Sequence, residues 1–438
     1  MVRINKMQES IKNFFEKPCD FRDVFVERRS STGIFFTLSK VKQKSSLSVS
    51  GAGFRTVSGD FNRYQSTILT DDVEELLIKN GVDLKLRSVS AGFDLDTFGE
   101  FLAEIDGSMR EAGKDKVKNI DFSFSLSDSV KGIWNGKTSV TSASSRAKFF
   151  VEVITSSPSA QEIASEHLIT DKPLGEHFLN SCREKSFRAL SVAVALLDAK
   201  NSPAGNFPVV ISAEAGGTFI HEAIGHSLEA DAVRYGISPV YAGKINERVA
   251  SSEVTVIDDP TLAGKNGSYD YDDEGVAPSR TVLIEKGILK NYLLDRKEAG
   301  FLSLDSNGHG RRESYKFKPI PRMGVTFLAP GNSDLSEMMK KINKGILIRK
   351  MGGGQVNPAN GDFVFEVSEG YLIENGKKKA LLKRATVAGN GPEILKNLKY
   401  VGGETGWDDG TCGKNGQGVA VTDGMPATLI ENVIVGGR

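Results

Sequence analysis

The chain is most informative at Phe207-Pro-Val-Val-Ile-Ser-Ala-Glu-Ala-Gly-Gly-Thr-Phe-Ile-His-Glu-Ala-Ile-Gly-His226. Val209–Ile211 is a short β-branched run, which predicts a strand, and Gly216-Gly217 separates it from a stretch with helical character. The whole chain has only five histidines, and two of them fall within the last six residues of this segment, with a Glu directly after the first. The segment therefore predicts a strand, a tight turn and a helix that carries a cluster of polar side chains.

The two histidines, His221 and His226, follow the pattern H-E-x-x-x-H. In a regular α-helix positions i and i+4 lie about 40° apart around the axis, whereas i and i+5 lie about 140° apart. Imidazoles at i and i+5 can share one tetrahedral zinc ion only where the helix is locally widened, as in a π-bulge. Gly225 lies inside the motif, where such a distortion costs least. The less favoured alternative is a pair of hydrogen-bonded structural histidines.

A catalytic zinc ion usually has three protein ligands and one open position. The segment Gly410-Thr-Cys-Gly-Lys-Asn-Gly-Gln-Gly418 places Cys412 among four glycines, so the backbone there can approach a metal closely. Thiolate is a good zinc ligand. Cys412 could equally be a small buried apolar residue, and the spacing alone does not decide between these interpretations.

The sequence resembles the TldD/PmbA family, and within it the TldD type. The strongest match is Gly217-Thr-Phe-Ile-His-Glu-Ala-Ile-Gly-His-Ser-Leu-Glu-Ala-Asp231. The similarity is strong over residues 205–438 and weaker before them. The supporting segments are Tyr271-Asp-Asp-Glu-Gly-Val-Ala-Pro-Ser-Arg280, Asn307-Gly-His-Gly-Arg-Arg-Glu-Ser314, Pro321-Arg-Met323, Met351-Gly-Gly-Gly-Gln-Val-Asn357, Ala388-Gly-Asn-Gly-Pro392 and the Cys412 loop.

This resemblance implies a zinc peptidase that acts on small or unfolded peptides. The ligands of the TldD-type members map to His221, His226 and Cys412, and the catalytic glutamate maps to Glu222. Zinc would supply Lewis acidity, and Glu222 would carry a proton from water to the leaving amine. PmbA-type members lack the metal motif, which this chain retains. The resemblance also implies a dimer, formed either by two copies or with a PmbA-type subunit.

Substrate binding has weaker candidates. His309 and Arg311, with Arg312, could donate hydrogen bonds to a substrate oxyanion, although a structural turn with solvated arginines is the favoured interpretation. Asp272-Asp-Glu274 lacks the spacing of a calcium loop and is better explained as a charged turn. Gly352-Gly-Gly354 lacks the lysine of a phosphate-binding loop, so a backbone that lines a peptide cleft is more plausible.

Glycine is distributed unevenly, with 12 of 46 in residues 1–200 and 34 in residues 201–438. We therefore predict an α+β protein with an N-terminal α/β-type or α+β domain, 1–200, and a β-rich, glycine-rich C-terminal domain, 201–438, that carries the metal-binding helix. Asn201-Ser-Pro-Ala-Gly205 is the predicted linker. Helices are predicted at 71–80, 94–112, 160–168 and 174–197, with strands at 24–28, 33–38 and 149–155.

The second half shows two hairpin signals. Lys286-Gly287 separates the predicted strands 282–285 and 288–294. Asn375-Gly376 separates the predicted strands 369–373 and 377–382. A helix is predicted at 333–344, because Asp334 and Glu337 would lie in its first turn.

Composition limits the other function classes. Lys plus Arg and Asp plus Glu both number 56, so no global field attracts nucleic acid or an anionic membrane. We expect neither a secretory signal nor a membrane span. Three widely spaced cysteines argue against a disulfide framework and indicate a cytoplasmic protein.

Two alternatives to a zinc peptidase remain. The first is a non-catalytic partner or regulator, because the family also includes proteins described as modulators of DNA gyrase. The intact metal motif argues against a purely inert role. The second is a hydrolase with Cys412 as nucleophile, which alkylation with and without zinc would distinguish from a metal site.

Overall fold

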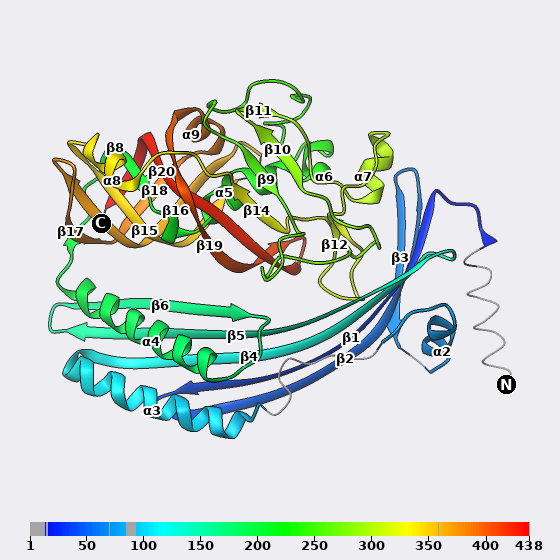
Figure 1. The fold of residues 1–438 in the computed structure, drawn as a ribbon, viewed down its shortest axis with the longest axis horizontal. Helices are drawn as coiled ribbons and strands as arrows, with labels where there is room; N and C mark the ends of the chain where they lie inside the picture. The colour runs from blue at the N-terminus through cyan, green and yellow to red at the C-terminus, as the bar shows by residue number, and fades with distance from the viewer. Residues whose placement is uncertain (1–13, 15, 70, 85–92, 358, 438) are drawn as a thin grey trace.

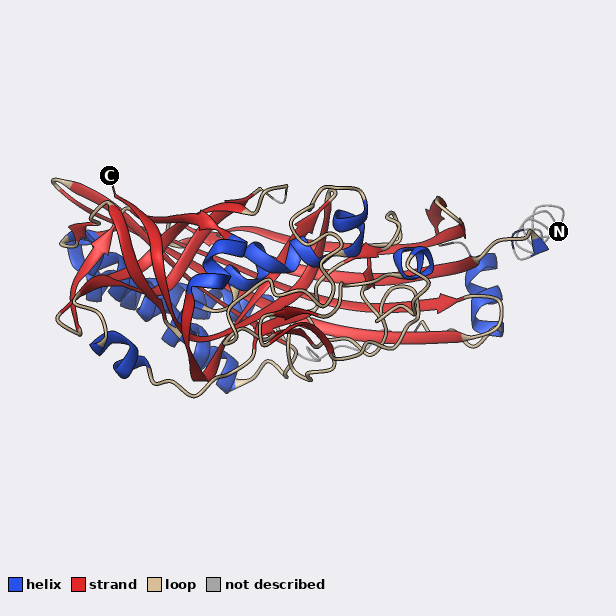
Figure 2. Cartoon of the chain, turned by 90° about the horizontal axis from the view of Figure 1, so that it is seen from above, coloured by secondary structure: helices blue, strands red, loops and turns tan. Residues whose placement is uncertain are grey.

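The fold is that of a computed structural model, which describes residues 14, 16–69, 71–84, 93–357 and 359–437. Two large β-sheets dominate it, one built from the first half of the chain and one from the second half (Figure 1). The long strands of the first sheet curve beneath the second sheet in this view. Seen from above, the molecule is elongated along these strands (Figure 2). The mixed α+β architecture expected from the sequence is confirmed.

The first sheet has the order β3-β2-β1-β4-β5-β6, and every neighbouring pair is antiparallel. Of the two arrangements predicted for this half, α/β is therefore wrong and α+β is correct. The predicted strands 24–28 and 33–38 are one continuous strand, β1. The strands are β1 (Phe21–Thr37), β2 (Lys40–Ser58), β3 (Phe61–Ile68), β4 (Val117–Trp134), β5 (Ser139–Ser157) and β6 (Ala160–Thr170).

Three of the predicted helices are confirmed: α2 (Asp71–Lys79), α3 (Leu95–Gly113) and α4 (Glu176–Leu197). Apolar side chains of α3, such as Leu102, and of α4, such as Phe178, pack on the sheet in one buried cluster. This packing fixes the sheet as a rigid platform below the second half of the chain.

Residues 160–168, predicted to be helical, instead form most of β6. This strand pairs with β5 from Ala160 to Thr170, and alternate side chains such as Ala164 and Glu166 are buried. Ala, Gln and Glu favour helices, but the prediction was wrong because intrinsic propensity is a small free-energy term that tertiary context overrides. Continuous pairing with a neighbouring strand outweighs it.

The second sheet has twelve strands, and its long path runs β11-β10-β9-β14-β20-β8-β15-β16-β17-β7. β7 ends at Asn201 and β8 begins at Gly205, so both strands reach into the predicted linker, and the division into two domains there stays a prediction. The strands are β7 (Lys200–Asn201), β8 (Gly205–Ile211), β9 (Val256–Asp258), β10 (Thr281–Glu285), β11 (Ile288–Leu289), β14 (Val325–Leu328), β15 (Lys344–Val356), β16 (Asp362–Glu374), β17 (Lys377–Lys383), β18 (Ala385–Asn390), β19 (Leu398–Lys414) and β20 (Gln417–Gly437).

Both predicted hairpins are confirmed, β10–β11 and β16–β17. Asn375 and Gly376 have positive φ angles of 50° and 74°, as a two-residue turn between twisted strands requires. The strand predicted at 288–294 is shorter, because β11 ends at Leu289. The helix predicted at 333–344 is also shorter: α8 covers Leu335–Lys340, and its N-cap Asp334 accepts from two backbone N–H groups.

Buried charged side chains join the two halves of the molecule. Arg55, on β2, contacts Asp23 Oδ2 at 2.7 Å and Glu274 Oε1 at 2.5 Å, and all three side chains are fully buried. Arg312, in the second half of the chain, donates to the other oxygen of Asp23, Oδ1, at 3.3 Å. The predicted charged turn at Asp272–Glu274 thus anchors the second half of the chain to the first sheet.

Among the described residues, no helix combines the length and apolar character needed to cross a membrane.

Candidate metal centre

The helix predicted after Gly217 contains the widened turn that the histidine spacing requires. An α-helical turn, α5 (Thr218–Ile220), leads into a π-helical segment at His221–Gly225 and a 3-10 turn at His226–Leu228. The N–H of His226 donates to the carbonyl of His221, five residues earlier. The predicted π-bulge is therefore confirmed, and it brings both imidazoles to one side of the helix.

Gly225 has a different role from the one predicted. Its φ and ψ angles are −53° and −54°, which any residue adopts in a helix. A Cβ at this position would lie 1.9 Å from the Sδ atom of Met323. The glycine is thus required because another segment packs directly on the π turn, and not because the backbone is unusual.

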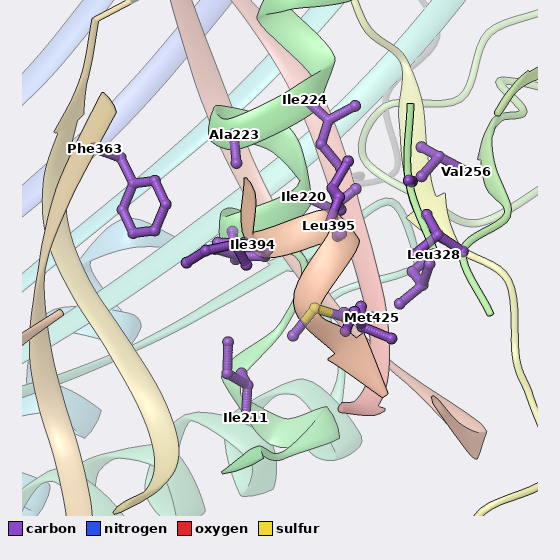
Figure 3. Close-up of a cluster of buried hydrophobic side chains, with 14 of the residues drawn as sticks. Ile211, Ile220, Ala223, Ile224, Val256, Leu328, Phe363, Ile394, Leu395 and Met425 are labelled. Atoms are coloured by element: carbon purple, nitrogen blue, oxygen red, sulfur yellow. The ribbon is translucent and has the colours of Figure 1, made fainter. Parts of the chain in front are cut away.

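Apolar packing fixes the rest of this helix. Ile220, Ala223 and Ile224 are fully buried and face a cluster that includes Leu395 and Met425 (Figure 3). Leu395 lies on α9 (Gly391–Asn397) and Met425 on β20. This close packing fixes the position of the helix that carries the two imidazoles.

The three predicted ligands come together. The candidate ligand atoms of His221, His226 and Cys412 all lie within 4.8 Å of one another. Cys412 Sγ is 3.3 Å from His226 Nε2. Tetrahedral zinc with its usual bond lengths separates neighbouring ligand atoms by about 3.3–3.6 Å. The donor set and its spacing fit a zinc ion.

Each imidazole is oriented by a carboxylate through its other nitrogen. His221 Nδ1 lies 2.7 Å from Asp423 Oδ1, and His226 Nδ1 lies 3.0 Å from Glu229 Oε2. Both Nε2 atoms are therefore directed towards Cys412. Carboxylate partners of this kind fix the tautomer and raise the basicity of metal-binding histidines.

The electrostatics of the cluster favour a thiolate. Burial raises the pKa of the Cys412 thiol, but hydrogen bonds to His221 and His226 outweigh this effect and lower the pKa to about 6. Burial lowers the pKa of His226, whereas Glu229 and Cys412 raise it to about 9. Without metal the cluster is thus a thiolate beside imidazolium, and metal binding would displace the imidazolium protons.

Glu222 follows the first histidine and is half-buried. In the part of the chain that the structure describes, its carboxylate has no hydrogen bond or ion pair. His221, directly before it, is held by its contact with Asp423, and Ala223, directly after it, is buried in the core. The Glu222 side chain therefore has no structural partner among the described residues, and its catalytic role stays a prediction.

The two candidate substrate-binding residues have internal partners. His309 is fully buried, and its ring nitrogens lie 3.0 Å from Asp258 Oδ1 and 2.9 Å from Asn307 Oδ1. Arg311 is also buried, and it donates to the carbonyl of Met323 at 2.5 Å. These contacts favour the structural role, and a contact of either side chain with substrate stays a prediction.

A large cavity of about 1290 Å³ lies between the two halves of the molecule. Its lining does not include the three candidate ligands or Glu222. Asp408 lines it, and this residue pairs in the β19–β20 ladder with Asp423, the partner of His221. The first half contributes Glu166, His167, Lys185 and Arg188.

Strand β15 has a free edge next to this cavity. It pairs with β8 only at Ile346–Ile348, after which the chain of β8 leaves towards the metal-binding helix. From 349 to 356 this edge has no strand partner among the described residues, and it includes Gly352-Gly-Gly354. Arg349, Lys350 and Met351 also line the cavity, and the strand lies against the π turn.

The residues that surround the three candidate ligands were not predicted from the sequence. Glu229 lies three residues after His226, a helical spacing that could have revealed it. Asp423, Arg322 and Lys414 carry no local signal of a metal site, because strand pairing and loop packing bring them to the centre from distant parts of the chain.

Two histidines on a π turn and a distal cysteine form a group that could hold a metal ion, and the histidines follow the H-E-x-x-x-H pattern. Residues 204–437 match the family described as PmbA/TldA metallopeptidase C-terminal domain. The chain belongs to this family, in agreement with the resemblance found in its sequence.

Individual relatives agree with this assignment. A metalloprotease TldD homolog from Buchnera aphidicola is 41% identical over 254 residues, which is 58% of this chain and 52% of that protein. A zinc metalloprotease TldD homolog from Saccharolobus solfataricus is 34% identical over 235 residues, or 53% of this chain and 52% of the relative. The chain thus matches about half the length of these curated relatives.

Solved structures share the whole fold at low sequence identity. A putative modulator of a DNA gyrase from Thermotoga maritima superposes with a TM-score of 0.76 at 19% identity, covering 99% of this chain and 98% of that one. TldE from Thermococcus kodakarensis superposes with a TM-score of 0.72 at 20% identity, covering 98% and 100%. These similarities establish the fold alone.

Proposed function

We propose that the protein is a zinc-dependent peptidase that hydrolyses peptide bonds in small or unfolded peptides. The observation that carries this proposal is the convergence of His221, His226 and Cys412, with Glu222 directly after the first of them in the chain. The names of the relatives support the same activity. A homodimer, or a heterodimer with a PmbA-type subunit, is a further expectation from the resemblance.

The residues of the chain divide the chemistry between them. Zinc, when bound, supplies Lewis acidity for the attacking water and the scissile carbonyl. His221, His226 and Cys412 hold it, while Asp423 and Glu229 keep the two imidazoles in place. Glu222 takes the proton of the water and passes it to the leaving amine.

The substrate would bind as an extended strand along the free edge of β15. Main-chain hydrogen bonds to such an edge do not depend on side chains, so many sequences would be accepted. Only unfolded segments could bind, because the backbone of a folded protein is already paired. Glu166 and Arg188, from the first half of the chain, close the cavity beneath this edge.

Zinc content is the direct test of the centre. Protein purified without a metal-affinity tag should contain about one zinc per chain, the usual content of a mononuclear site. Elemental analysis by mass spectrometry measures this value. Substoichiometric zinc that added metal does not restore would contradict the proposal.

Substrate selection can be tested separately. Short unstructured peptides should be cleaved, whereas stable folded proteins that contain the same sequences should resist, because the edge of β15 and its cavity admit only an extended chain. Time courses followed by mass spectrometry would compare the two. Equal cleavage rates for the peptides and for the folded proteins would exclude the free edge of β15 as the binding site. The zinc site itself could still be correct.

A further inference from the structure

Arg322 is a buried cation next to the candidate metal centre that has no place in the chemistry above. It follows the short strand β13 (Ile320–Pro321), and its side chain is fully buried. A buried guanidinium is costly unless its environment supplies acceptors. Its partners therefore indicate why an arginine occupies this position.

Two of these partners belong to the β19–β20 hairpin, whose first strand carries Cys412. Nη2 of Arg322 donates to the carbonyl of Cys412 at 2.6 Å, and Nη1 donates to the carbonyl of Gln417 at 3.2 Å. The turn at Asn415-Gly416 lies between these carbonyls and joins β19 to β20. The guanidinium thus ties together the two sides of this hairpin at the level of the thiolate.

The third partner belongs to the helix that carries His226. Nε of Arg322 lies 3.9 Å from Oε1 of Glu229, and neither atom has a hydrogen-bond partner among the described residues. The other oxygen of Glu229 accepts from His226. Lys414 reaches that same oxygen at 3.1 Å and also contacts Asp231 at 2.6 Å.

We propose that Arg322 is a positioning residue of the metal centre, which couples the backbone of Cys412 to the carboxylate that orients His226. This inference rests on the proposed function, because it assumes that these side chains bind zinc. The fork of an arginine can reach two carbonyls and a carboxylate at once, whereas the single ammonium of a lysine cannot. Arg322 therefore holds two ligands from distant parts of the chain at the separation that one ion requires.

The test is the zinc affinity of Arg322→Lys and Arg322→Met, measured by competition with a chromophoric chelator after removal of the native metal. We expect both variants to bind zinc roughly 10–100-fold more weakly, the usual effect of removing an outer partner of a metal ligand. The cobalt-substituted variants should also show an altered ligand-field spectrum, because the ligand geometry changes.

Arg55→Met is the matched control. Arg55 is equally buried and ion-paired, but it contacts Asp23 and Glu274 and neither ligand-bearing segment. The Arg55→Met variant should have a lower melting temperature and an unchanged affinity for zinc. An equal loss of affinity in this variant would show that global stability explains the effect, and would overturn the assignment of Arg322.

Wild-type affinity in either Arg322 variant would also overturn the proposal. If Arg322→Met does not fold, the zinc affinity of Arg322→Lys, which keeps the positive charge, decides between the two outcomes. Glu229→Gln provides a second measurement, since its loss of affinity should not add to that of Arg322→Lys if the two residues act as one unit. A wild-type protein that fails to bind zinc at all would instead refute the proposed function.

Discussion

Glu222→Gln should keep its zinc and lose peptidase turnover by roughly 10²–10⁴-fold, the usual contribution of a general base. Glutamine has nearly the shape of glutamate, but it cannot accept the proton of the attacking water. Glu222 is not a ligand in the proposed centre, so the metal should stay. Steady-state kinetics on an unstructured peptide, together with zinc analysis of the same sample, would measure both effects.

Glu253→Gln is a suitable control, because Glu253 is exposed and lies far from the cluster in sequence. This variant should retain full activity and full zinc content. Turnover of Glu222→Gln at the wild-type rate would show that another group moves the proton. Loss of zinc from Glu222→Gln would indicate that the carboxylate is itself a ligand.

Cys412→Ala should lose zinc binding and peptidase activity together. Removal of a direct ligand leaves two imidazoles and should weaken zinc binding by more than the roughly 10–100-fold expected for an outer partner. Zinc content after dialysis against a weak chelator and the rate of peptide hydrolysis would be measured in parallel.

Cys182→Ala is the matched control for this variant. Cys182 is also a buried free cysteine, but it belongs to the core of the first sheet, where burial raises its pKa. Its replacement should leave zinc content unchanged. If Cys412→Ala kept its metal but lost activity, and zinc did not protect Cys412 of the wild-type protein from alkylation, a cysteine nucleophile would explain the data better.

The sequence predicted those features that are encoded within a few neighbouring residues. The spacing of His221 and His226 required a π turn, and the turn is present. The Asn375-Gly376 pair required a tight hairpin, and its positive φ angles follow from these residue types. In each case a local steric rule was sufficient, and no knowledge of the surrounding fold was needed.

Features that depend on distant packing could not be predicted. Residues 160–168 became a strand because β5 was available as a partner, which their composition does not reveal. Gly225 is required by Met323, almost one hundred positions later. The carboxylate that orients His221 comes from Asp423 on another strand. The spacing alone did not decide whether Cys412 is a ligand, and only the resemblance to a family made it the third candidate ligand.

The wide separation of the ligand segments has a consequence for the assembly of the candidate metal centre. The helix with His221 and His226 lies early in the second half of the chain, whereas Cys412 lies on β19, in the part of this strand that pairs with β20. Closing so long a loop costs conformational entropy that must be offset by strand pairing. The three candidate ligands can therefore come together only after β19 has paired with β20. Under the proposed function, peptidase activity would arise only after this pairing, and loss of the β19–β20 pairing would abolish it even if the helix with His221 and His226 stayed folded.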